Sequence, residues 1–125
     1  MPRFVVLEHA GHPEDSGGRH FDLLLENHSA CRTWKMFTLP ESGKGAVAAQ
    51  ELPPHRLAWL DIMESPVSGN RGRARRIDAG TFEVTSSDTR DLSDADKLVV
   101  KMDGTMLRGF LRFESFEEGW ALRLE

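Results

Sequence analysis

Short runs in which apolar and polar residues alternate recur along the whole chain, and almost no segment keeps a helical period. Alternation with a period of two is typical of β-strands with one buried and one exposed face. The strands that this pattern predicts cover residues 3–8, 20–26, 32–37, 56–62, 72–77, 80–84, 97–102, 107–113 and 120–124. Many short strands at near-regular spacing favour an all-β fold, a compact antiparallel β-barrel that leaves few sheet edges open.

Glycine and aspartate mark the predicted connections between these strands. Residues 78–80 (Asp-Ala-Gly) and 103–104 (Asp-Gly) predict tight hairpin turns, because glycine accepts the positive φ that such turns require. Residues 117–119 (Glu-Glu-Gly) predict a third reversal. Residues 43–50 and 92–96 are expected to form short connecting helices. No repeat or linker-like stretch interrupts the chain, so we expect one domain over residues 1–125.

The composition is ordinary for a globular protein, with 39% hydrophobic and 29% charged residues among 125. No apolar run approaches the roughly 20 residues that a membrane-spanning helix needs. The first residues lead straight into a predicted strand, which leaves no room for a signal peptide. Cys31 is the only cysteine, so an internal disulfide is excluded. Together these features predict a cytoplasmic protein that does not partner a membrane.

The charge of the chain is acidic overall but uneven along the sequence. A formal net charge of −4 argues against a protein that coats nucleic acid electrostatically. Four arginines nevertheless fall within six residues in and after a glycine-rich run at 68–72, namely Arg71, Arg73, Arg75 and Arg76. Such a local basic face can hold a phosphate group even on an acidic protein. A solvated strand face explains the same cluster equally well.

The strand around residue 22 carries the most informative chemistry. His20 and Asp22 are two residues apart, so their side chains share one face of the predicted strand, opposite the apolar Phe21 and Leu23. His9 follows another strand-like run that can pair beside this one. Two imidazoles and one carboxylate on one surface are a plausible ligand set for a divalent transition metal. The pattern therefore predicts a metal site and favours metal-assisted hydrolysis.

Several segments, taken in order, carry a family resemblance. They are residues 4–9 (Phe-Val-Val-Leu-Glu-His), 20–26 (His-Phe-Asp-Leu-Leu-Leu-Glu), 33–34 (Thr-Trp), 55–59 (His-Arg-Leu-Ala-Trp), 80–83 (Gly-Thr-Phe-Glu), 107–113 (Leu-Arg-Gly-Phe-Leu-Arg-Phe) and 120–122 (Trp-Ala-Leu). The chain thus resembles, over nearly its whole length, the 3′-phosphoesterase domain of bacterial DNA ligase D, an enzyme of non-homologous end joining. The resemblance implies a β-barrel hydrolase that removes 3′-phosphates and 3′-ribonucleotides from DNA ends during repair. It also implies a free-standing protein that works beside a separate ligase or polymerase.

The resemblance assigns roles to individual residues of this chain. His9, His20 and Asp22 match the family's metal ligands, for which manganese is our first expectation and zinc fits the same donors. His55 matches a histidine that contacts the scissile phosphate. Trp59 stands where the family has tyrosine, and a base or sugar of the substrate can stack on it.

Leu24 is the departure that matters most, because the family usually has an arginine there that grips phosphate. We expect Arg71 and Arg73 to supply the missing charge, both for catalysis and for substrate binding. Arg73 and Arg75 would share one strand face, opposite Arg76. Leu24 also favours an alternative, a catalytically impaired barrel that binds DNA ends or a repair partner. A metal-dependent hydrolase of another small phosphorylated or cyclic substrate is a third possibility.

Overall fold

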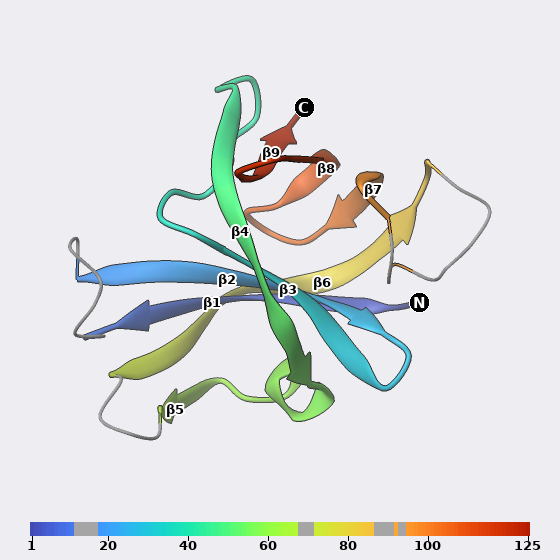
Figure 1. Cartoon of the computed structure of the whole chain (residues 1–125). Helices are drawn as coiled ribbons and strands as arrows, with labels where there is room; N and C mark the ends of the chain where they lie inside the picture. Colours follow the sequence, from blue (N-terminus) through green and yellow to red (C-terminus); the bar gives the residue numbers. More distant parts are fainter. Residues whose placement is uncertain (12–17, 68–71, 87–91, 93–94) are drawn as a thin grey trace.

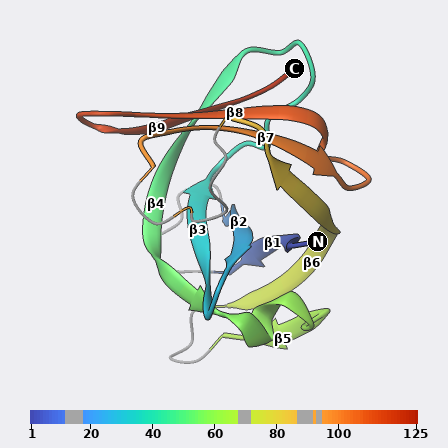
Figure 2. The same ribbon diagram turned by 90° about the vertical axis from the view of Figure 1, so that its right-hand side faces the viewer.

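The computed structural model describes residues 1–11, 18–67, 72–86, 92 and 95–125, and it confirms the predicted all-β class. Eight antiparallel strands form a closed barrel, and one further strand lies outside it (Figures 1 and 2). Around the barrel the strands are β1 (Arg3–Ala10), β2 (Arg19–Asn27), β3 (Ala30–Met36), β4 (Ala46–Arg56), β9 (Gly119–Leu124), β8 (Arg108–Phe116), β7 (Lys97–Asp103) and β6 (Arg73–Val84), and β6 pairs back onto β1. The outer strand β5 (Glu64–Pro66) pairs with β6, and a short 3₁₀-helix, η1 (Leu57–Leu60), precedes it.

The barrel wall formed by β1, β2 and β3 is apolar on both faces. Phe4 and Leu23 point into the main core, where they join Trp34, Phe113 and other buried side chains. Leu24 points outward into a second, smaller cluster with Leu60 of η1. The outer layer of η1 and β5 therefore packs on the outside of this wall, and it explains why β1 and β2 are buried along nearly their whole length.

The path of residues 43–62 differs from the sequence prediction. Residues 43–50 were expected to be helical, but β4 begins at Ala46, and the predicted strand over 56–62 is instead η1 and its flanks. The adjacent Pro53 and Pro54 argue against a strand at the sequence level, because proline has no N–H group to donate to a sheet ladder. They are tolerated here because β9 pairs only with the start of β4, up to Ala49, and leaves this edge of the strand open beyond it. The expected helix over 92–96 includes residues 93–94, which lie outside the described residues.

The predicted turn at 78–80 is wrong, because β6 runs straight through it. A β-bulge where β6 pairs with Val6 and Leu7 takes up one extra residue, and the strand continues to Val84. Gly80 is required for another reason: a Cβ atom there would lie 2.1 Å from the carbonyl oxygen of Asp103 on the neighbouring strand. The glycine thus allows two backbones to approach closely and does not mark a reversal.

Asp78 organises the connection between β7 and β8, where the predicted reversal at 103–104 is confirmed. Its buried carboxylate accepts hydrogen bonds from four backbone N–H groups, those of Ala79, Thr105, Met106 and Leu107, at 2.8–3.0 Å. The reversal at 117–119 is confirmed as well, since β8 ends at Phe116 and β9 begins at Gly119. One carboxylate therefore fixes a whole hairpin connection against β6.

Among the described residues, no helix is long and apolar enough to cross a membrane. Cys31 is buried in the outer cluster, and burial raises the pKa of its thiol to about 11. The thiolate that would act as a nucleophile is therefore scarce near neutral pH. Cys31 thus packs in the outer apolar cluster.

Candidate metal centre

The two histidines and the aspartate singled out in the sequence lie together on the outer face of the barrel wall. The β1–β2 register pairs His9 with His20 and Leu7 with Asp22, so all four side chains share one face. The imidazole rings of His9 and His20 stack at a centroid distance of 4.6 Å and an interplanar angle of 8°. One ligand atom from each of His9, His20 and Asp22 lies within 4.8 Å of the others. The hairpin thus builds the predicted cluster from residues of regular strands.

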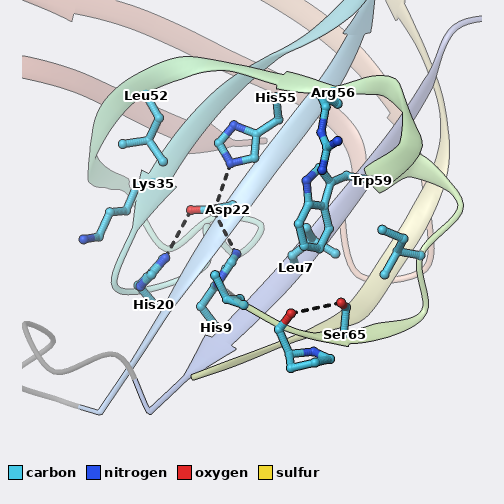
Figure 3. A pocket seen from close by; sticks show the side chains of 13 residues that line it. Leu7, His9, His20, Asp22, Lys35, Leu52, His55, Arg56, Trp59 and Ser65 are labelled. Atoms are coloured by element: carbon cyan, nitrogen blue, oxygen red, sulfur yellow. Dashed lines mark hydrogen bonds and ion pairs between the residues drawn. The ribbon is translucent and has the colours of Figure 1, made fainter. Parts of the chain in front are cut away.

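Asp22 is the centre of this cluster (Figure 3). Its Oδ2 lies 3.0 Å from Nε2 of His9, and its Oδ1 lies 3.4 Å from Nε2 of His20. Burial raises the pKa of Asp22, but the contacts with His20 and His9 outweigh this effect and lower it to about 2. The side chain is therefore a carboxylate throughout the neutral pH range, as a metal ligand must be.

Two buried atoms of the cluster lack a hydrogen-bond partner. They are Nε2 of His9 and Oδ1 of Asp22, whose short approaches to their neighbours do not have hydrogen-bond geometry. Buried polar atoms are normally paired, since an unpaired one costs about 1–3 kcal/mol. A divalent cation between these atoms would satisfy both, so the residues fit a metal of borderline hardness.

His55 reaches the same carboxylate from β4. Its Nε2 lies 3.8 Å from Oδ2 of Asp22, and its Nδ1 lies 3.0 Å from the carbonyl oxygen of Pro53. The structure thus brings His55 to the three predicted ligands, although 33 residues separate it from Asp22 in sequence. The turn of η1 directly after β4 places Trp59 on the same side.

A groove of about 600 Å³ opens over this cluster. The barrel wall forms its floor, and residues of β4, η1 and β5 with their connections form its other side. Its lining residues are Leu7, His9, His20, Asp22, Lys35, Leu52, His55, Arg56, Trp59, Ile62, Ser65, Pro66 and Val67. Metal-ligating, basic and aromatic side chains therefore share one opening.

Of the two predicted arginines the structure describes only Arg73, which does not line this groove. Arg71 lies outside the described residues, and Arg73 forms an exposed ion pair with Glu64 at 2.9 Å. The register explains the position of Arg73: His9 pairs with Ala74, so Ala74 shares the face of His9 and Arg73 points to the opposite face of the sheet. Arg76 lies on the face of the metal centre, where it donates to the carbonyl oxygen of Leu60 at 3.3 Å.

Within the part of the chain that the structure describes, Lys35 and Arg56 are the lysine and arginine that line the groove, and neither was predicted from the sequence. Lys35 pairs directly with Asp22 in the β2–β3 register, so the two side chains share a face. In the structure a tight turn at His28, whose φ is +59°, sets this register. The sequence would have indicated the same pairing if β2 and β3 had been treated as a hairpin. Arg56 forms no ion pair with any residue that the structure describes.

Leu24 occupies the position at which the family resemblance predicts an arginine. Its side chain is fully buried in the outer apolar cluster with Val5, Cys31 and Leu60. The leucine therefore helps to seat η1 on the barrel wall, and a charged side chain there would lose this packing.

Comparison with known proteins adds no family assignment: the chain matches no protein-family model and none of the curated proteins. The likeness to the 3′-phosphoesterase domain accordingly rests on the sequence motifs alone.

Proposed function

We propose that the protein is a metal-dependent phosphoesterase that acts on 3′ ends of DNA, including ends that carry a ribonucleotide. The observation that carries this proposal is the cluster of His9, His20 and Asp22 in a groove that basic side chains also line. Nε2 of His9 and Oδ1 of Asp22 are buried there without a hydrogen-bond partner. The motif resemblance supplies the substrate class. The metal-ligating and basic side chains of the groove suit a phosphate group.

The residues of the groove divide the work of hydrolysis. A divalent ion, when bound by the three ligands, supplies Lewis-acid activation of a phosphate oxygen; manganese and zinc are both compatible with these donors. Lys35 and Arg56 can neutralise the remaining phosphate charge. The hydroxyl of Ser65 donates to the carbonyl oxygen of Pro66 at 3.1 Å and is not directed at the cluster.

Water is therefore the nucleophile in the proposed reaction. It attacks phosphorus, the bond between phosphorus and the 3′ oxygen breaks, and a proton passes to that oxygen. For an end that carries a 3′-phosphate, the products are a 3′-hydroxyl end and inorganic phosphate. Trp59, half-buried at the groove, offers a surface on which the terminal base or sugar can stack.

The direct test is incubation of the purified chain with Mn²⁺ and a primer–template that carries a 3′-phosphate. We expect a 3′-hydroxyl primer and inorganic phosphate, and we expect EDTA to stop the reaction. Binding of the primer end without any release of phosphate, with Mn²⁺ or Zn²⁺ present, would favour the alternative of a binding barrel. The buried Leu24 favours that alternative, because it stands where the family has a phosphate-binding arginine.

The cations of the groove give a matched comparison. We expect Lys35→Ala and Arg56→Ala each to lower kcat/KM for 3′-phosphate release by on the order of 10- to 10²-fold, because each removes a charge from the phosphate's surroundings. Arg73→Ala should keep nearly full activity, since Arg73 lies on the opposite face and pairs with Glu64. Initial rates on the same primer–template measure all three variants. If Arg73→Ala alone caused a large loss of activity, Arg73 would be the phosphate-binding arginine that the sequence predicts.

A further inference from the structure

We infer that His55 is a fourth protein ligand of the metal, so that three imidazoles and one carboxylate hold the ion. The inference rests on the proposed metal site and specifies its donor set. It gives His55 a role different from the phosphate contact that the resemblance implies.

The hydrogen bond at the far side of the ring defines which nitrogen of His55 is available. The carbonyl oxygen of Pro53 can only accept, and Nδ1 of His55 lies 3.0 Å from it. Nδ1 therefore carries the proton, and in the neutral ring Nε2 keeps its lone pair. Metal-bound histidines typically have this arrangement, in which the second nitrogen donates to a backbone carbonyl or a carboxylate.

The free nitrogen points at the metal cluster. Nε2 of His55 lies 3.8 Å from Oδ2 of Asp22, the same oxygen that His9 approaches at 3.0 Å. In this position Nε2 and the carboxylate oxygen that it faces can both bind one cation placed between them. Ligand atoms about 2.1 Å from a shared metal are separated by about 3.0–3.4 Å in octahedral or tetrahedral geometry. Nε2 of His55, at 3.8 Å from Oδ2 of Asp22, lies beyond this range, so sharing the metal requires its ring to move toward the other three ligands.

The backbone around His55 is shaped for this position. Cys31 on β3 pairs with His55, so His55 projects on the outer face of the wall, toward the metal cluster. The β3–β4 register shifts between Cys31 and Thr33, close to the two prolines that precede His55. This irregularity re-aims the end of β4, as β-bulges beside functional sites commonly do.

A third imidazole strengthens the preference for zinc and cobalt over manganese that a site with two imidazoles and a carboxylate already has. Imidazole nitrogen suits zinc and cobalt, whereas manganese prefers oxygen ligands. We therefore expect the chain to bind Zn²⁺ and Co²⁺ more tightly than Mn²⁺. Lys35 and Arg56 remain to hold the phosphate, because His55 would be occupied by the metal.

Proton NMR of the full chain loaded with Co²⁺ tests the inference directly. Each imidazole bound through Nε2 gives one strongly shifted, exchangeable ring N–H signal, so we expect three such signals in the wild type and two in His55→Ala. His28→Ala, altered in the exposed turn between β2 and β3, is the matched control and should keep three. Competition titrations should show His55→Ala losing at least about 10²-fold in Zn²⁺ affinity.

Two signals in the wild type would overturn the role of His55 and leave the proposed phosphoesterase standing. If the wild type showed no shifted signals and did not bind Co²⁺, the metal site itself would be refuted, and with it the proposed function. Because the wild-type count decides between these outcomes, a His55→Ala variant that fails to fold does not affect the test. His55→Gln, which keeps the size of the side chain better, provides a second variant for the affinity measurement.

Discussion

Replacing Asp22 by alanine is expected to abolish metal binding and to lower 3′-phosphate release by on the order of 10³-fold or more. Asp22 approaches both His9 and His20, and its carboxylate is the charged donor of the cluster. Its lowered pKa, about 2, means that the wild-type ligand set loses this charge only in strong acid. Calorimetric titration with Mn²⁺ and Zn²⁺ measures binding, and phosphate release measures activity.

Two companion variants separate metal loss from general damage. Asp22→Asn keeps the shape of the side chain but removes its charge, and it should also fail to bind tightly. Asp61→Ala removes an exposed carboxylate that pairs with Arg3 at 2.9 Å, and it should behave as wild type. Full activity of a folded Asp22→Ala protein, or an unchanged metal affinity, would contradict the site.

The largest expected effect on stability comes from Asp78→Ala. This substitution leaves the backbone N–H groups of residues 79 and 105–107 without their buried acceptor. Each lost bond costs about 1 kcal/mol and more when the donor stays buried, so we expect a loss of about 3–5 kcal/mol. For a chain of this size the melting temperature should fall by roughly 10–20 °C. Thermal and urea unfolding followed by circular dichroism measure the change.

Asp103→Ala is the matched control, because Asp103 lies in the same hairpin but is exposed and pairs with Arg108 at 3.1 Å. Surface ion pairs of this kind contribute about 0–1 kcal/mol. Equal stabilities of the Asp78 and Asp103 variants would show that the four hydrogen bonds have little net value.

The sequence was sufficient for the fold class because most strands keep a period-two pattern on at least one face. It failed where tertiary contacts outweigh local preference. Residues 78–80 have the composition of a turn, yet Asp78 binds a distant loop and Gly80 admits the backbone of Asp103. The β4 strand was missed because two prolines argue against strands, and only the short β4–β9 pairing makes them acceptable.

The candidate site divides in the same way. His9, His20 and Asp22 follow from alternation within one hairpin, which local sequence encodes well. The basic residues depend on register between strands that lie far apart in sequence. The bulge in β6 puts Arg76 on the face of the cluster and leaves Arg73 on the other, and no local pattern reveals that shift. Lys35 required only the β2–β3 register, so it was within reach of the sequence.

The wall with two apolar faces has a consequence for how this protein can change. His9, His20 and Asp22 lie on β1 and β2, strands paired on both sides, whereas much of the opposite side of the groove belongs to η1, β5 and their connections. This cover is joined to the wall by the Leu24–Leu60 cluster, the Arg76–Leu60 hydrogen bond and the short β5–β6 pairing. Substitutions in residues 62–67 can therefore alter which molecules enter while the ligand geometry is inherited unchanged. The scaffold and the selectivity of the groove are separable traits, open to independent evolution or design.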